Sequence, residues 1–254
     1  FLAVRDDGGL ILVPLAYLIG TVAAALHTNH HMVKKLGYRV ALGGLREAAA
    51  ELRESGIYFV STFASTALSV TSTFVMGIVG MPTAQIAYWG VAFQVVQAVQ
   101  AMYDPITTSI YPHVAGKRDH KFVLLITLCL LPLVAAGCVL LYCLAGLAVK
   151  IIAGSAYLAA VPVLQALTPM LLFSFVAQML GFPLLGALGR ERQASFTTLV
   201  AAGAQILGLV GLALSHHFTL LSLALLRNVT ELIFMILRIY FVGVFLRERR
   251  KSRR

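Results

Sequence analysis

Charged residues are scarce in this chain of 254 residues. Asp, Glu, Lys and Arg together make up 12% of the sequence, about half of the ~25% that is usual in soluble domains. Hydrophobic residues make up 59%, and a soluble domain of this length would not bury that much apolar surface. The composition therefore excludes most cytosolic enzymes, nucleic-acid-binding modules and disordered chains, and it predicts an integral membrane protein.

Cysteines and catalytic motifs are also few. Cys129, Cys138 and Cys143 lie inside apolar runs without metal-ligand spacing, so we expect buried thiols. The sequence lacks HExxH, Gly-x-Ser-x-Gly and phosphate-loop patterns. We therefore expect a protein that is not an enzyme, with no catalytic residue, metal or cofactor.

One histidine cluster, His27-Thr28-Asn29-His30-His31, has the HxxHH form found in membrane di-iron desaturases. Such a site needs several boxes on one side of the membrane. The other paired histidines, His216 and His217, are predicted on the opposite side. We therefore interpret the cluster as interfacial histidines.

Alternation of apolar and polar residues with a period of two is absent, which argues against a strand barrel. Seven apolar segments approach or exceed the ~20 residues needed to cross a bilayer as a helix. They are 10–26, 57–80, 84–115, 122–149, 158–189, 194–214 and 219–246. Their length and internal prolines predict that 84–115 and 158–189 tilt, kink or extend past the membrane. We predict an all-α, polytopic membrane helix bundle with one leading helix and a six-helix unit.

The distribution of basic residues predicts the orientation of these segments. The net charge is +10, and 16 of the 20 Lys and Arg residues fall in alternate connections and the C-terminal tail. The positive-inside rule places those connections and the C-terminus in the cytoplasm and the N-terminus outside. The basic tail 247–254 is expected to anchor this topology at anionic lipid, although a specific partner is an alternative.

The connection 27–56 is the longest and divides the leading segment from the rest. Its second half, 44–54, has an apolar stripe opposite three glutamates, which is typical of an amphipathic helix on a membrane surface. A passive linker is the alternative interpretation. We accordingly divide the chain into a leading helix (1–26), a cytoplasmic linker with an amphipathic helix (27–56), a six-helix lobe (57–246) and a basic cytoplasmic tail (247–254).

Charges within the last segment are the most informative positions, because a charge in lipid costs about 2.5–3.5 kcal/mol on insertion scales. Arg227, Glu231 and Arg238 lie within roughly 40° on one face of a helix. They fit a cationic wall of a wet cavity that meets an anionic ligand. The alternative is a neutral Arg227–Glu231 pair and one Arg that reaches the interface.

Two other segments carry polar faces. In 84–115, Gln94, Gln97, Gln100 and Asp104 share one side. The amides fit a cavity or a helix–helix contact, and Asp104 fits a proton site, a cation site or a partner for Arg227. In 57–80 the hydroxyl stripe fits a polar lumen or a tight helix seam; its members are Ser61, Thr62, Ser65, Thr66, Ser69, Ser72 and Thr73.

A small-residue face on 194–214 and just beyond it predicts helix packing; it comprises Ala201, Ala204, Gly208, Gly211 and Ser215. The three polar faces together predict a bundle around a hydrated cavity. The residues expected to line the substrate cavity are Arg227, Glu231, Arg238, Gln94, Gln97, Gln100, Asp104, Ser65, Ser69 and Ser72.

The segment from Tyr88-Trp89-Gly90 to Asp104-Pro105-Ile106-Thr107-Thr108-Ser109-Ile110-Tyr111-Pro112 resembles a signature of polysaccharide flippases. The preceding Ser72-Thr73-Phe74-Val75-Met76-Gly77 and the later 153–160 and 189–192 are similar to other parts of that family. The resemblance covers residues 45–245, and the order of the motifs carries it. The family is the Wzx-type (O-antigen) flippase family of the multidrug/oligosaccharidyl-lipid/polysaccharide exporter superfamily.

The resemblance implies the function, the location and the partners. It implies the last helix of an N-terminal lobe that is missing here, followed by a complete C-terminal lobe. It implies a multi-pass protein of the bacterial cytoplasmic (inner) membrane, with a role in lipopolysaccharide biosynthesis. The substrate would be an undecaprenyl-linked glycan, moved to the outer leaflet by alternating access. Membrane lipids and glycan-assembly proteins are the other expected partners, and no nucleic acid is expected.

The chain departs from the family at one point. Phe93-Gln94 stands where the family tends to carry an acidic–basic pair, and Gln97 replaces a further basic residue. The resemblance then leaves the cationic role to Arg227 and Arg238. An exporter of drugs or of the peptidoglycan lipid precursor is the first alternative, and a membrane-embedded glycan enzyme is the second.

Overall fold

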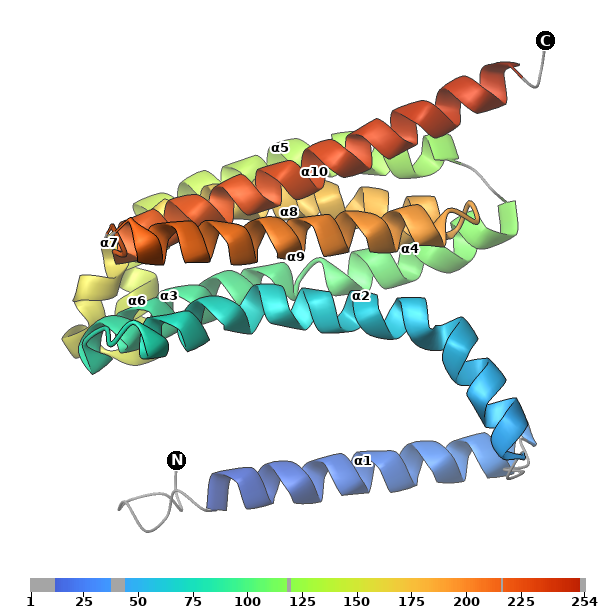
Figure 1. The fold of residues 1–254 in the computed structure, drawn as a ribbon, viewed down its shortest axis with the longest axis horizontal. Coiled ribbons are helices and arrows are strands. Elements are labelled where there is room, and N and C mark those ends of the chain that lie inside the picture. Colours follow the sequence, from blue (N-terminus) through green and yellow to red (C-terminus); the bar gives the residue numbers. More distant parts are fainter. Residues whose placement is uncertain (1–11, 38–43, 118–119, 216, 252–254) are drawn as a thin grey trace. The chain divides into compact units, whose positions relative to one another are not determined.

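The computed structural model describes residues 12–37, 44–117, 120–215 and 217–251 (Figure 1). All regular structure in these ranges is helical, so the predicted all-α class is confirmed. The chain forms two compact units, Phe1–Glu54 and Ser55–Arg254. Each unit is described by itself below.

The first unit contains α1 (Leu12–Leu36) and the beginning of α2 (Leu45–Ile78). Helix α1 continues past residue 26, where we expected the first segment to end. Lys34 and Lys35 in its last turn complement the negative end of the helix dipole. Gly37 follows with φ +65°, the left-handed conformation that commonly ends a helix. The expected amphipathic stretch 44–54 is helical from Leu45 as part of α2, and its side chains lie outside what the structure describes.

The second unit contains the rest of α2 and the helices that follow it (Figure 1). These are α3 (Thr83–Gln100), α4 (Asp104–Lys117), α5 (His120–Cys143), α6 (Ala145–Ala153), the 3₁₀ helix η2 (Ser155–Ala160), α7 (Val161–Leu167), α8 (Pro169–Leu180), the π-helical η3 (Gly181–Gly186), α9 (Glu191–Leu214) and α10 (Leu220–Lys251). Helix α10 begins with a reciprocal cap, in which the Thr219 and Ser222 side chains each accept a hydrogen bond from the other's backbone N–H.

The predicted helix 84–115 is divided into α3 and α4. Pro105 has no backbone N–H, and its ring would clash with the carbonyl of Ala101 in a continuous helix. The chain therefore tightens before the proline, where Met102 and Tyr103 donate to carbonyls three residues earlier. Helix α4 then begins at Asp104, whose carboxylate suits the positive end of the helix dipole.

The predicted helix 158–189 is divided further, into η2, α7, α8 and η3. Pro162 and Pro169 each lie in the first turn of a new helix, a position that tolerates a missing N–H. The break after α8 takes the form of a π-helix that contains Pro183. Such π-helical turns are rare and are frequent at functional sites.

Helix α8 forms the centre of the second unit. It packs against α10, α5 and α3, and 67% of the stretch Pro169–Gly186 is buried. Helix α5 is peripheral, with only 11% of its apolar stretch buried. A helix that is apolar on all sides belongs either in a core or in lipid. Helix α8 represents the first case and α5 the second.

Five helices in the described part of the chain are long and apolar enough to cross a membrane. They cover Phe59–Ile78, His120–Cys143, Pro169–Gly186, Glu191–Leu214 and Leu220–Arg249. The predicted number of about seven is not confirmed, because 84–115 is not one continuous helix and the first segment, 10–26, begins in residues that the structure does not describe. The membrane-embedded, multi-pass character of the protein rests on these five helices.

The expectation of buried thiols is wrong for two of the three cysteines. Cys129 and Cys143 are exposed on α5, and Cys138 is partly buried. An apolar side chain on a peripheral membrane helix can face lipid as readily as protein, so its position in an apolar run did not determine burial.

Candidate functional site

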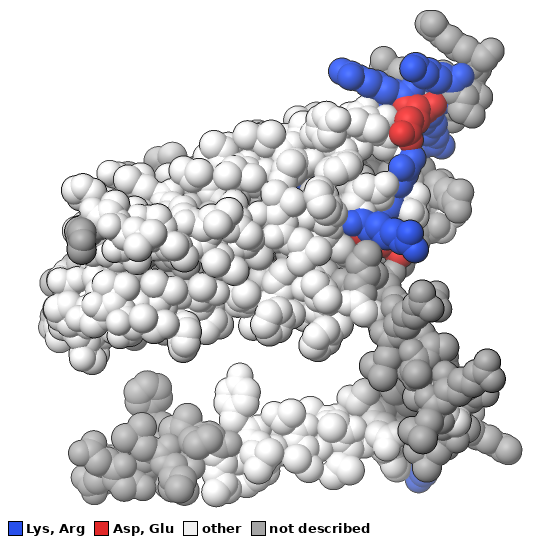
Figure 2. Space-filling view, viewed as in Figure 1, with Lys and Arg blue, Asp and Glu red and all other residues white. Residues whose placement is uncertain are grey.

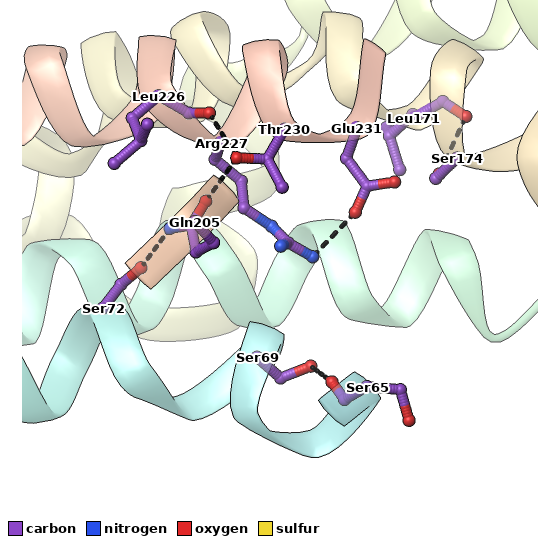
Figure 3. A network of polar contacts seen from close by, with 10 residues as sticks. All are labelled: Ser65, Ser69, Ser72, Leu171, Ser174, Gln205, Leu226, Arg227, Thr230 and Glu231. Atoms are coloured by element: carbon purple, nitrogen blue, oxygen red, sulfur yellow. Dashed lines mark hydrogen bonds and ion pairs between the residues drawn. The ribbon is translucent and has the colours of Figure 1, made fainter. Parts of the chain in front are cut away.

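The three charged side chains of α10 are all buried, with exposed fractions of 4% for Arg227, 4% for Glu231 and 5% for Arg238. Arg227 Nη2 lies 2.8 Å from Glu231 Oε1, one helical turn away (Figure 3). The i,i+4 spacing places the two groups one above the other on the helix. The ion pair foreseen as the alternative interpretation is therefore present.

Arg227 lies in apolar surroundings. Its guanidinium is 5.9 Å from the centre of the Phe93 ring on α3. Its Nε and Nη1 atoms have no hydrogen-bond partner within the described part of the chain. Removing one charge of a buried pair leaves the other uncompensated, so this pair is a structural feature that requires both members.

Arg238 lies three turns farther along α10 in a different environment. Its Nε and Nη2 donate to the hydroxyls of Thr197 (3.2 Å) and Thr198 (3.4 Å) on α9. Nη1 donates to the Ala177 carbonyl on α8. The Phe234 ring centre lies 3.9 Å from the guanidinium carbon, within the range of a cation–π contact.

The guanidinium of Arg238 donates its hydrogen bonds to neutral oxygen atoms. No carboxylate of the described residues forms an ion pair with it. Hydrogen bonds from a guanidinium to hydroxyl and carbonyl oxygens offset part of the desolvation cost of burying its charge. Arg238 therefore carries a buried charge without a direct ion-pair partner among the described residues, whereas Arg227 is paired with Glu231.

A cavity of about 340 Å³ lies beside Arg238 within the second unit. It is bordered by α2, α4, α8, η3, α9 and α10. Its lining residues are Ser61, Thr62, Ser65, Leu68, Asp104, Thr107, Gln178, Phe182, Pro183, Thr198, Phe234 and Arg238. Most of them carry a hydroxyl, amide or charged group, so the cavity offers both hydrogen-bond donors and acceptors in an apolar bundle.

The cavity brings together three of the residues predicted for it: Arg238, Asp104 and Ser65. Asp104 is exposed, and α4 presents it where α3 breaks. The break that divides 84–115 into two helices therefore also places the Asp104 carboxylate in the cavity wall. The hydroxyl of Ser65 donates to the carbonyl of Thr62 on its own helix at 2.8 Å, and the hydroxyls of Thr66 and Ser69 also donate to carbonyls of α2.

Other predicted residues lie elsewhere. Gln94 and Gln97 are exposed on α3 and Gln100 is partly buried there, and none of the three lines the cavity as the described residues define it. Ser69 is partly buried and donates to the Ser65 carbonyl (Figure 3). The single polar face expected on 84–115 thus divides between the surface and the cavity, and the division coincides with the break between α3 and α4.

Ser72 belongs to a seam between helices. Gln205 on α9 donates from Nε2 to the Ser72 hydroxyl at 3.1 Å, and its Oε1 accepts from Thr230 on α10 at 2.7 Å (Figure 3). All three residues are buried, with exposed fractions of 1–2%. These two hydrogen bonds join α2, α9 and α10. The hydroxyl stripe therefore contributes to both structures expected as alternatives: a cavity wall at Ser61 and Ser65, and a helix seam at Ser72.

Sequence reasoning missed several residues around Arg238. Gln178 lines the cavity, Thr197 and Thr198 hold the guanidinium, and Gly181 provides the space for it. Only the adjacent hydroxyls of Thr197 and Thr198 in an otherwise apolar segment could have signalled this role. Pairing them with Arg238 requires the packing of α9 on α10.

The described residues contain no group of three or more His, Cys, Asp or Glu side chains that could hold a metal ion. His216 of the paired histidines lies outside them. The site is therefore built from one buried cation, one carboxylate and a set of hydroxyl and amide groups. Searches of protein-family models, curated proteins and solved structures return no match to this chain.

Proposed function

We propose that this chain is part of a transporter that moves a lipid-linked oligosaccharide or polysaccharide repeat unit from the cytoplasmic to the outer leaflet of a bacterial inner membrane. The observation that carries the proposal is the cavity of about 340 Å³ with the buried guanidinium of Arg238 in its wall. The resemblance of residues 45–245 to the Wzx-type flippases supplies the substrate class.

The chemistry of the lining fits two parts of such a substrate. The linking phosphates are anionic and lose hydration when they leave water, and Arg238 would offset part of that cost. The sugar hydroxyls both donate and accept hydrogen bonds. Ser61, Thr107 and Gln178 offer groups of both kinds. The lipid tail would remain in the bilayer.

Alternating access requires walls that can move. Two walls of the cavity are broken helices: α4 follows the turn at 101–103, and the π-helical η3 follows α8. Discontinuous helices at a substrate site are common in transporters because the break can absorb a change in backbone angles. The proposal assigns the motion to these two breaks.

The test is complementation of a flippase-null strain by the intact gene that encodes this chain, with surface polysaccharide as the readout. We expect complementation by the native gene and a loss of export with Arg238→Ala at unchanged membrane abundance. Arg238→Lys should retain part of the activity, since the charge remains and the forked geometry is lost. Failure of the native gene in strains that lack each of several flippases would contradict the proposal.

A second candidate is an ion-coupled exporter of drugs or of the peptidoglycan lipid precursor. The observation that favours it is Asp104, a carboxylate that lines the cavity in a membrane helix bundle. In this case Asp104→Asn should abolish the dependence of transport on a proton or cation gradient. If instead Asp104→Asn leaves gradient dependence unchanged, this second candidate is rejected.

A further inference from the structure

Charged side chains gather at one end of the second unit. Figure 2 shows Lys, Arg, Asp and Glu side chains at the end where α10 finishes, whereas the other described residues of this unit on the face in view are uncharged. Two contacts tie the helix ends together there: Arg190 at the start of α9 pairs with Glu248, and Arg249 lies 2.7 Å from Nδ1 of His120 on α5. The described basic side chains at this end are Lys121, Arg190, Arg192, Arg247, Arg249 and Lys251, against the acidic Glu191 and Glu248. This end therefore carries an excess of positive charge.

A pocket of about 230 Å³ opens at the same end. It lies between the η3–α9 turn and the last turns of α10. Its lining consists of Leu185, Arg190, Gln193, Phe241, Val244, Phe245 and Glu248. It is separate from the cavity beside Arg238, since the two share no lining residue among those described.

The pocket is amphipathic along α10. Glu248 and Arg190 form its polar end, and Phe241 lies two helical turns farther from the C-terminus, at a distance of about 10 Å along the helix axis. The Phe196 and Phe241 rings meet edge to face with centres 6.3 Å apart. Phe196 and the neighbouring Tyr240 are exposed by 53% and 62%. The apolar end thus continues into an exposed aromatic surface that faces lipid in a membrane helix.

Arg190 is held in place at the polar end. It pairs with Glu248 and lies 6.0 Å from the Phe245 ring centre. When the side-chain amide of Gln193 is oriented so that its nitrogen donates to the Arg190 carbonyl, its oxygen accepts a hydrogen bond from Arg190 Nη1 at 3.1 Å. The Arg190 side chain remains 36% exposed, so guanidinium N–H groups are available for an oxyanion beside the apolar wall.

We propose that this pocket binds one anionic phospholipid, with its phosphate at Arg190 and the first part of an acyl chain along Val244 and Phe241. Two observations select this occupant. The positive excess favours an anionic headgroup over a zwitterionic one. The apolar wall fits an acyl chain, which a phospholipid has and inorganic phosphate does not. The proposal does not depend on which substrate the other cavity carries.

The test uses the full chain in detergent, with lipid binding followed by native mass spectrometry. We expect phosphatidylglycerol to bind more tightly than phosphatidylcholine. Arg190→Gln should weaken phosphatidylglycerol binding by at least about tenfold, the range of one charge-assisted hydrogen bond. The matched control is Arg192→Gln, which removes the same charge two residues away on an exposed side chain outside the pocket lining. It should change binding by less than about twofold, because an exposed charge is screened by salt.

A second variant keeps every charge. Val244→Phe fills the apolar part of the pocket, and it should weaken phosphatidylglycerol binding as Arg190→Gln does. Three results would overturn the proposal: equal losses from Arg190→Gln and Arg192→Gln, equal binding of the two lipids, or full binding by Val244→Phe. Displacement of the lipid by millimolar inorganic phosphate would also overturn it, in favour of a free phosphate site.

Discussion

The guanidinium of Arg238 occupies the space that a side chain on residue 181 would fill. A Cβ added to Gly181 would lie 2.3 Å from Nη1 and 2.6 Å from the guanidinium carbon of Arg238. Cβ atoms do not approach other atoms so closely, so the cation keeps its position only because residue 181 is glycine. Gly181 also begins the π-helical turn that borders the cavity. A single small residue therefore links the break in α8 to the placement of the charge.

Gly181→Ala tests this relationship. The new methyl group must displace the end of the Arg238 side chain, which is flexible, so the fold should persist while the cation moves. We expect export in the complementation assay to fall about as far as with Arg238→Ala, at normal membrane abundance. Gly203→Ala on α9 is the control, because a Cβ there meets no atom within 4 Å. Full export by Gly181→Ala would show that the position of Arg238 is not critical.

The Arg227–Glu231 pair should affect stability more than transport. Arg227→Leu alone leaves a buried carboxylate without its partner, and we expect a loss of about 3–5 kcal/mol in the free energy of unfolding. Arg227→Leu combined with Glu231→Leu should restore most of that loss. Thermal unfolding can be followed through the single tryptophan, Trp89, which is buried. A double variant as unstable as the single one would contradict a self-contained pair.

The hydrogen bonds that link Ser72, Gln205 and Thr230 should hold α2 against α9 and α10. Gln205→Leu removes both hydrogen bonds. Such bonds between membrane helices contribute about 0.6 kcal/mol each, so we expect a loss of about 1 kcal/mol in the free energy of unfolding. Gln97→Leu, which changes an exposed amide on α3, should leave the melting temperature within error. A similar decrease in both variants would argue against a specific seam.

Close packing of α9 on α10 predicts a steric effect at Gly208. A Cβ on Gly208 would lie 2.2 Å from Cδ1 of Leu226. Gly208→Val should therefore force the helices apart and cost about 1–3 kcal/mol. Gly211→Ala changes the same small-residue face where a Cβ meets nothing within 4 Å, and its melting temperature should not fall. Pairing Gly208→Val with Leu226→Ala should restore stability, and a failure to do so would contradict this contact.

The sequence by itself determined the fold class and the positions of most apolar helices. Few charges and long apolar runs leave helices in a membrane as the stable solution, since backbone groups in lipid must be satisfied within the segment. It also determined that Arg227, Glu231 and Arg238 share one face, because helical periodicity depends only on spacing. The i,i+4 pair of Arg227 and Glu231 follows from the same local rule.

Only the tertiary structure decided which of these charges borders the cavity: Arg238 lines it, and Arg227 and Glu231 do not. Residues of three other elements surround Arg238: Ala177 of α8, Gly181 of η3, and Thr197 and Thr198 of α9. Their approach depends on packing that no local pattern records. The turn at 101–103 similarly places Asp104 on a different helix from the amides of α3, and of these residues only Asp104 lines the cavity as the described residues define it. Local periodicity places residues on faces, whereas the packing of helices distant in the sequence decides which face meets a cavity.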